Sequence, residues 1–185
     1  DVRMFYVSKT LYSISFWKEY VYELSPIIFK NTGRLKKAII FDCDNTLWKG
    51  ILGEDGIGGI DMAAESNVGQ IFNRIQQIAV WLSKQGVIVG LCSKNNLDDV
   101  DKALSEHPDM ALKKEHIVIS KVNWDNKATN LRAISEALNI GLDSIVFVDD
   151  SPFEINLVRE QIPEVLSHQV PKKLEGYPNE LLSII

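Results

Sequence analysis

Residues 37–48 read Lys-Ala-Ile-Ile-Phe-Asp-Cys-Asp-Asn-Thr-Leu-Trp, and this stretch decides the fold. Residues 37–41 form a short apolar run rich in residues that favour strands, which predicts a buried strand. Two acids, Asp42 and Asp44, follow at once, and a Gly-rich polar stretch runs from Lys49 to Gly59. Acids placed directly after a buried strand indicate a site at the carboxyl end of a sheet.

Strand-like and helix-like patterns alternate along the rest of the chain. Further strands are expected at residues 87–92, 116–119, 144–148 and 165–170, and helices at residues 68–84, 97–107, 127–138 and 152–160. Gly86, Pro108 and Gly141 are expected to end the first three helices. Strands with few polar residues that alternate with amphipathic helices predict a parallel sheet covered on both faces. We therefore expect a doubly wound, Rossmann-like α/β fold.

The two flanks differ from this central pattern. We expect an N-terminal arm over residues 1–34, a catalytic core over residues 35–170 and a C-terminal tail over residues 171–185 with a helical turn. The arm is rich in aromatic residues, and the spacing of Phe16, Tyr20 and Leu24 predicts a helix near residues 15–24. Two interpretations stay open. The arm covers one face of the core, or it is the remnant of an upstream domain, which a chain that begins at Asp1 permits.

Composition excludes several classes of protein. The 185 residues include 20 Lys+Arg and 25 Asp+Glu, and a net charge of -5 argues against nucleic-acid binding as the main task. No apolar run approaches the roughly 18–20 residues that span a membrane, and a secretory signal is absent from the N-terminus. The two cysteines are too few for a disulfide scaffold and predict a reducing, cytoplasmic setting.

Polar residues follow the expected strands where each strand ends, and Lys127 opens the helix before the fourth strand. They are Asp42, Asp44, Thr46, Ser93, Lys94, Asn95, Asp149 and Asp150. Carboxyl ends of parallel strands meet at one edge, so four acids would crowd together and raise one another's pKa values. A divalent cation relieves that repulsion, and hard oxygen ligands with few neighbouring His or Cys favour Mg²⁺. The sequence therefore predicts a magnesium site formed by Asp42, Asp44, Asp149 and Asp150.

These residue types are those of phosphoryl transfer. Asp42 is expected to attack phosphorus as a nucleophile, and Asp44 to protonate the leaving oxygen and later deprotonate water. Ser93 and Lys127 are expected to bind and neutralise the phosphoryl oxygens. We also assign Thr46, Lys94 and Asn95 to phosphate binding.

Each signal alone has an ordinary explanation. A Ser after a strand is commonly a cap, a Lys that opens a helix is commonly solvated, and Asp149 with Asp150 could simply cap the next helix. The prediction rests on their occurrence together, in this order and each at the right end of its element.

The same residues resemble the four motifs of the haloacid dehalogenase (HAD) superfamily. The strings FDCDNTLWKGILGEDG, LCSKNN, EHPDM, NWDNKATNLR and VFVDDSPFE are similar to the FkbH-like branch, usually grouped with HAD subfamily IIIC. The resemblance covers residues 36–162, and the N-terminal segment is similar to the stretch that precedes this domain in that branch.

The resemblance implies a flap near residues 50–59, with Asp42 as nucleophile and Asp44 as general acid and base. It implies Mg²⁺ held by the carboxylates of Asp42 and Asp149 and the main-chain carbonyl of Asp44, with Asp150 direct or through water. FkbH-like proteins are associated with dephosphorylating a bisphosphoglycerate and loading its glyceryl group onto an acyl carrier protein.

In some FkbH-like proteins a cysteine thioester is invoked. The resemblance therefore raises a thioester role for Cys43 or Cys92. The alternative for each cysteine is a small buried residue between strand and loop.

The number of residues between the motifs also indicates that no cap domain fits between them. The span 48–68 accommodates only a flap, and the span 93–127 is filled by a helix and a short strand. An open site favours a phosphorylated substrate presented on something large, such as a carrier-protein arm or a protein side chain.

Two rival interpretations are a phospho-accepting receiver-like signalling domain and a binding domain with little turnover. A positioned base at Asp44 distinguishes the enzyme, because it would hydrolyse an acylphosphate quickly.

Overall fold

A computed structural model describes residues 12–13, 15–17, 20–21, 24 and 36–184. The chain divides into two compact units, Asp1–Leu35 and Lys36–Ile185. In the first unit the described residues within 15–24 are helical, and the ring of Phe16 stacks on those of Tyr12 and Tyr20, with centroids 4.3 and 5.8 Å apart. The rest of the arm expected over residues 1–34 lies outside the described residues.

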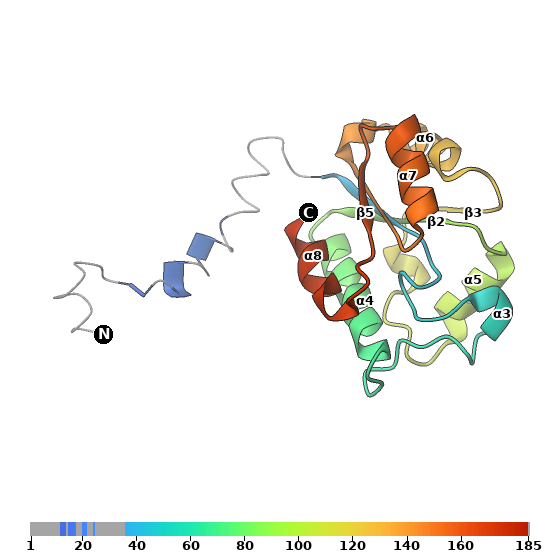
Figure 1. Cartoon of the computed structure of the whole chain (residues 1–185), viewed down its shortest axis with the longest axis horizontal. Helices are drawn as coiled ribbons and strands as arrows, with labels where there is room; N and C mark the ends of the chain where they lie inside the picture. Colours follow the sequence, from blue (N-terminus) through green and yellow to red (C-terminus); the bar gives the residue numbers. More distant parts are fainter. Residues whose placement is uncertain (1–11, 14, 18–19, 22–23, 25–35, 185) are drawn as a thin grey trace. The chain divides into compact units, whose positions relative to one another are not determined.

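The second unit is built on a five-stranded parallel sheet in the order β3-β2-β1-β4-β5 (Figure 1). The strands are β1 Ala38–Phe41, β2 Ile88–Ser93, β3 Ile119–Val122, β4 Ile145–Asp149 and β5 Leu166–Gln169. The central strand β1 pairs Phe41 with Leu91 on one side and with Val148 on the other. This topology confirms the predicted doubly wound α/β fold, and its order reverses at β1 and β4, where such sheets bind ligands.

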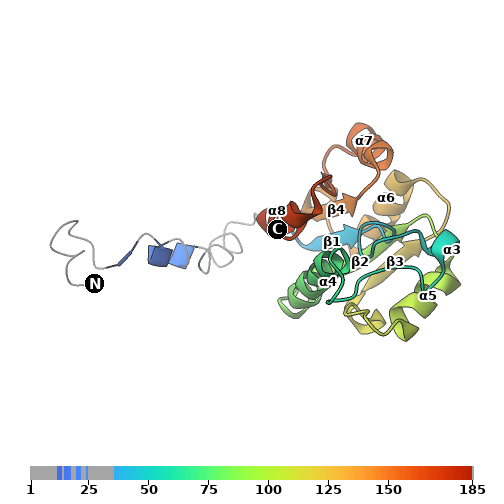
Figure 2. The same cartoon turned by 60° about the horizontal axis from the view of Figure 1, so that its bottom comes forward.

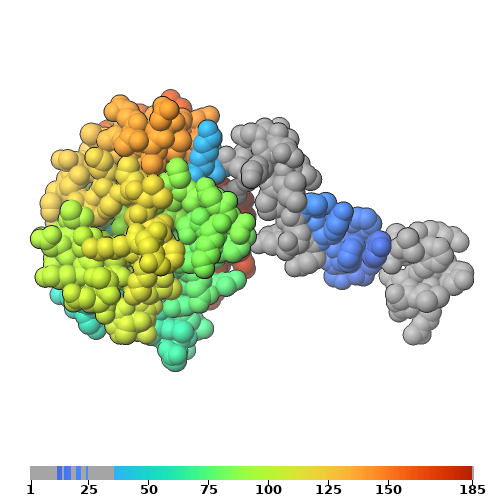
Figure 3. All heavy atoms as spheres, turned by 180° about the vertical axis from the view of Figure 1, so that it is seen from behind, coloured from blue at the N-terminus to red at the C-terminus, as the bar shows by residue number. Residues whose placement is uncertain are grey.

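Helices cover both faces of the sheet (Figure 2). The α-helices of this unit are α3 Leu52–Asp55, α4 Gly69–Lys84, α5 Leu97–Glu106, α6 Lys127–Leu138, α7 Pro152–Gln161 and α8 Tyr177–Ser183, with short 3₁₀ turns η1 Lys114–His116, η2 Leu142–Ser144 and η3 Leu174–Gly176. Side chains alternate along β1, so that Ile39 and Phe41 pack with α4 and α5 while Ala38 and Ile40 pack with α6 and α7. Seen from behind, α5 and the chain that leads to β3, yellow-green to yellow, form one continuous surface (Figure 3).

Several predicted helix boundaries are confirmed. α6 has the expected bounds 127–138, and Asn96 caps α5 by accepting a hydrogen bond of 2.9 Å from the Asp98 N–H. The α6 C-terminus differs from the prediction. Asn139, at φ 51°, adopts the left-handed conformation that ends α6, whereas Gly141 caps the turn η2.

The third strand was predicted too early, at residues 116–119. His116 belongs instead to η1, and β3 begins at Ile119. Pairing with β2 decides this register, because Ile119 lies opposite Gly90 and Val122 opposite Ser93. β3 is an edge strand with only Val122 buried, so its hydrophobic pattern is weak.

The C-terminal segment after β5 packs into the core of this unit. It forms η3 and then α8, which packs against α4. Tyr177 and Leu181 are fully buried in the cluster of apolar residues on the α4 side of the sheet. Among the described residues, the structure contains no helix with the length and apolar character needed to cross a bilayer.

Candidate active site

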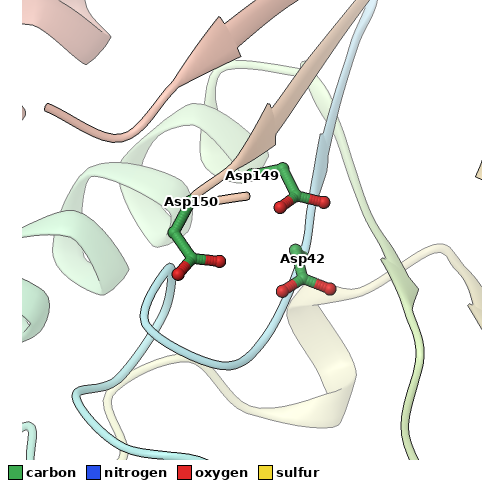
Figure 4. Close-up of side chains that lie close together, drawn as sticks. All are labelled: Asp42, Asp149 and Asp150. Atoms are coloured by element: carbon green, nitrogen blue, oxygen red, sulfur yellow. The ribbon is translucent and has the colours of Figure 1, made fainter. Parts of the chain in front are cut away.

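Three acids meet at the carboxyl end of the sheet. Asp42 follows β1, Asp149 ends β4 and Asp150 follows it, and one carboxylate oxygen of each lies within 4.8 Å of the others. Figure 4 shows the three carboxylates turned toward a common space. Asp42 and Asp149 are buried, and Asp150 is half-buried. The register of β1 with β4 brings them together, since the Asp42 N–H donates to the Val148 carbonyl at 2.8 Å.

Lys127 neutralises part of this charge. Its Nζ donates to Asp42 Oδ1 at 2.5 Å and to Asp149 Oδ2 at 3.0 Å, and a third hydrogen bond of 2.8 Å goes to the Cys92 carbonyl. The side chain is buried because Lys127 is the first residue of α6, which begins beside the end of β2. Asn126 fixes that start by accepting a hydrogen bond of 2.8 Å from the Ala128 N–H.

The pKa values reflect this crowding. Burial raises the pKa of Asp42 from its ordinary 3.8 to about 6; the Lys127 ammonium opposes the rise and the Asp149 carboxylate adds to it. Burial also raises the pKa values of Asp149 and Asp150. For Lys127, burial lowers the pKa, but the two carboxylates outweigh it and hold the net pKa above the ordinary 10.5. A single ammonium therefore leaves the three acids with unbalanced negative charge.

The donor set fits a hard divalent cation. Asp42, Asp149 and Asp150 offer only oxygen atoms, and they are the one group of three such ligands found among the described residues. Carboxylates without His or thiolate ligands suit Mg²⁺ better than zinc or copper. The Asp44 side chain is not part of this group, and the predicted ligand there is its main-chain carbonyl.

Asp44 is instead oriented by three hydrogen-bond donors. Its Oδ1 accepts from Trp48 Nε1 at 2.9 Å and from the Leu52 N–H at 3.0 Å, and its Oδ2 accepts from Asn95 Nδ2 at 2.8 Å. The N–H of Leu52 is the first of the flap helix α3, so Asp44 also supplies that helix with an acceptor. In this structure Asn95, predicted to bind phosphate, holds the Asp44 carboxylate.

Ser93 and Thr46 are both buried. The Ser93 side chain lowers the pKa of Asp42, which opposes the larger rise caused by burial. Thr46 Oγ1 has no hydrogen-bond partner among the described residues, while its carbonyl accepts from the Tyr177 hydroxyl at 3.2 Å. Thr46 thus carries a buried hydroxyl that no described residue satisfies.

Lys94 contacts an acid that the sequence did not single out. Its Nζ lies 2.7 Å from Oε1 of Glu154, which is buried in the first turn of α7. This ion pair ties the loop after β2 to the loop after β4. Glu154 is the last residue of the string VFVDDSPFE but was given no role, and Tyr177 carried no sequence signal, because an acid in a helix and a tyrosine outside a motif are common surface features.

Both cysteines are buried and unpaired. Burial raises the pKa of Cys92 to about 12 and that of Cys43 well above its ordinary 9.0. A protonated thiol is a poor nucleophile, so these thiols have the properties of inert core residues.

The segment after the acids forms a small flap. Asn45, at φ 50°, and Gly50, at φ 109°, turn the chain, and the Gly50 N–H donates to Asn45 Oδ1 at 3.2 Å. Between Trp48 and Gly69 the structure contains only the short helix α3, and the region between β2 and α6 holds α5, η1 and β3. Within residues 36–184 no inserted domain covers the site.

The fold and the arrangement of the site, a doubly wound parallel sheet with three acids at its carboxyl edge, can be compared with those of solved structures. The chain is similar to the N-terminal part of the protein BF1531 from Bacteroides fragilis, whose phosphatase domain was solved in complex with Mg. The identity is 35% and the TM-score 0.81, and the match covers 100% of this chain and 49% of that one, so the chain spans about half the length of that structure.

Two more distant structures share the fold. A HAD family enzyme from Bacteroides thetaiotaomicron, in complex with magnesium and inorganic phosphate, is 13% identical with a TM-score of 0.50 over 72% of this chain and 93% of its own. An uncharacterized protein from Corynebacterium glutamicum is 13% identical with a TM-score of 0.52 over 80% of this chain and 94% of its own. No protein-family model and no curated protein sequence matches the chain.

Proposed function

We propose that the chain is a Mg²⁺-dependent phosphatase or phosphotransferase that works through an aspartyl-phosphate on Asp42. The observation that carries the proposal is the buried Asp42 carboxylate, held 2.5 Å from Lys127 Nζ and facing Asp149 and Asp150. The 35% identity with a Mg-complexed phosphatase domain supports it.

Asp42, Asp149 and Asp150, with the Asp44 carbonyl, are the residues that would hold Mg²⁺. When bound, the ion supplies positive charge that stabilises the phosphoryl oxygens. It would also offset the crowding of the three carboxylates, which a single ammonium only partly balances.

In the first step, an Asp42 oxygen forms a bond to phosphorus while the bond to the alcohol oxygen breaks. Lys127 and Ser93 neutralise and bind the equatorial oxygens, and Asp44 gives a proton to the leaving alcohol. To act as an acid, Asp44 must carry a proton in place of one accepted hydrogen bond. In the second step a water gives its proton to Asp44 and attacks phosphorus, and inorganic phosphate leaves as the Asp42 carboxylate is restored.

A finer proposal concerns the substrate. Phosphorylated small molecules and protein-tethered phosphoesters are both compatible with a site that no inserted domain covers within residues 36–184. The resemblance to FkbH-like proteins of HAD subfamily IIIC favours processing of a glyceryl phosphate and its transfer to an acyl carrier protein in the cytoplasm. The buried, protonated thiols of Cys43 and Cys92 argue against a thioester on either residue during that transfer.

Hydrolysis of an aryl phosphate with Mg²⁺ tests the activity. Asp42→Asn is expected to abolish phosphate release, and excess EDTA to stop turnover of the unmodified chain. Asp143→Asn is the matched control, because Asp143 is exposed in η2 before the amino end of β4. Unchanged turnover in Asp42→Asn, with circular dichroism showing an intact fold, would refute the proposal. A phospho-Asp42 that persists for hours would instead indicate a receiver-like domain.

A further inference from the structure

Two aromatic side chains are left in solvent at the edge of the sheet that carries the acids. Trp124 is 75% exposed and Phe153 is 68% exposed, and they are the two aromatic residues within 36–184 that are more than half exposed. Trp124 lies in the loop between β3 and α6, and Phe153 lies in the first turn of α7, after β4. Both loops leave the carboxyl ends of their strands, where the site lies.

The strand order places Asp42 between these loops, whereas Asp149 and Asp150 end and follow β4 itself. β3 and β4 flank β2 and β1, whose carboxyl ends carry Ser93 and Asp42. The loops after β3 and β4 therefore border the candidate phosphate site on opposite sides. Each ring is thus carried by a loop that borders the candidate site.

Polar contacts connect both of these loops to the segment Ser93–Lys94 at the end of β2. Asn123, next to Trp124, donates its N–H to the Ser93 carbonyl at 3.0 Å, and Glu154, next to Phe153, pairs with Lys94 Nζ at 2.7 Å. Each aromatic residue is therefore one position from a residue bonded to the segment Ser93–Lys94.

The loop that carries Trp124 is fixed. The Asn123 side chain exchanges two hydrogen bonds with the buried Asn130, of 2.8 and 3.3 Å, and accepts a third, of 3.0 Å, from the Asp125 N–H. Asn126 then caps α6. The backbone on both sides of Trp124 is thus held while its ring stays exposed. Single exposed apolar residues are common, but two exposed aromatic residues in the two loops that border one candidate site are a specific arrangement.

We propose that Trp124 and Phe153 form a leaving-group subsite that selects phosphomonoesters whose alcohol part has a flat apolar ring. This inference rests on the proposed phosphatase activity and names its substrate class, and it stands against the glyceryl-phosphate proposal. No inserted domain encloses the site within residues 36–184, so in this part of the chain the loops at the edge of the site are the segments that can contact the alcohol part. Aromatic faces bind flat rings by stacking and by burial of apolar surface. A glyceryl phosphate has no such ring, so the subsite favours general phosphatase activity over glyceryl transfer.

Steady-state kinetics with two phosphomonoesters test the subsite. With Mg²⁺ present, Trp124→Ala and Phe153→Ala are each expected to raise KM for 1-naphthyl phosphate roughly three- to tenfold, the size of one aromatic contact. The kcat for this ester and the KM for glycerol 2-phosphate should stay the same. Trp81→Ala is the matched control, because Trp81 is 48% exposed on α4 and should change neither KM.

The outcomes separate the two proposals. Unchanged KM for 1-naphthyl phosphate in both variants, while Asp42→Asn still abolishes turnover, would overturn the subsite and leave the phosphatase standing. If Asp42→Asn still hydrolyses both esters, and the unmodified chain still does so in EDTA, the proposed phosphatase mechanism is wrong. The subsite proposal, which rests on that mechanism, is then wrong as well. Because both side chains are exposed, these substitutions remove no core packing, and circular dichroism checks that the fold is intact.

Discussion

The side-chain amide of Asn95 donates a hydrogen bond of 2.8 Å to the Asp44 carboxylate, across 51 residues of sequence. Asn95 belongs to the loop after β2, whereas Asp44 follows β1, so the bond joins two neighbouring strand ends. Trp48 and Leu52 complete the set of donors to the same carboxylate. The proposed general acid is therefore positioned by residues that make no side-chain hydrogen bond to Asp42, Asp149 or Asp150 in this structure.

Asn95→Ala removes one of those donors. We expect kcat to fall about tenfold with little change in KM, because a hydrogen bond to a charged group contributes about 1.5–3 kcal/mol and Asp44 would lose its orientation. The pH dependence of kcat should shift as well, which a purely structural role would not cause. Asn96→Ala is the control; it removes the cap of α5 and should cost about 1 kcal/mol of stability with kcat unchanged. Equal kcat in Asn95→Ala and the unmodified chain would contradict the positioning role.

Asp44→Asn removes the proposed acid and base while keeping a side chain of the same size. We expect turnover to fall about 10²- to 10⁴-fold, the range typical of general acid–base catalysis. If the second step is slowed more than the first, phospho-Asp42 accumulates. Intact mass after an acid quench, followed by loss of the added phosphate in hydroxylamine, would detect it. A variant with unaltered turnover would rule out the role of Asp44.

Stability without metal should depend on pH through Asp42. The raised pKa means that the folded state keeps a proton on Asp42 up to about pH 6, whereas the unfolded chain releases it near 3.8. Folding then binds a proton between these values, so the free energy of unfolding falls as pH rises through this window, by at most about 3 kcal/mol for this group.

Urea unfolding at pH 4 and pH 7, in EDTA, measures this loss. Asp42→Asn should lack the Asp42 contribution, so the difference between the two proteins isolates it. Added Mg²⁺ should restore stability at pH 7, because an ion bound only to the folded state stabilises it. Identical pH slopes in both proteins would show that Asp42 titrates normally in the folded state.

Tyr177 links the C-terminal segment to the loop that carries the acids. Tyr177→Phe removes the hydroxyl that donates to the Thr46 carbonyl at 3.2 Å and should cost about 1 kcal/mol. Tyr177→Ala also empties a fully buried site and should cost about 3–5 kcal/mol. Thermal or urea denaturation measures both changes. Equal stability of the two variants would mean that α8 contributes little to the fold.

The thiols of Cys43 and Cys92 should resist alkylation in the folded protein. At pH 8 a thiol with a pKa of about 12 is almost wholly protonated, and burial also blocks the reagent. Iodoacetamide labelling followed by mass measurement should show no adduct in native buffer and two adducts in urea. Rapid labelling of either cysteine in native buffer would revive a thioester role for that residue.

Local patterns predicted the elements well where they were strong. The apolar run before Asp42, the 127–138 helix and the Asn96 cap depend on residues close in sequence, and the structure confirms them. The third strand was misplaced because an edge strand buries little, so its position depends on pairing with β2 rather than on its own pattern.

For the candidate site, too, some features could be predicted from local sequence and others depend on tertiary contacts. The sequence by itself determined which acids and which serine would stand at strand ends and which lysine would open a helix, because side chains that directly follow buried parallel strands must meet at one edge of the sheet. Only the tertiary structure decided which groups they contact. Asn95 donates a hydrogen bond to Asp44, and Lys94 forms an ion pair with Glu154, rather than contacting the three acids. Tyr177, in the C-terminal segment, donates a hydrogen bond to the Thr46 carbonyl. These are long-range contacts, and they depend on packing between elements that no local spacing records.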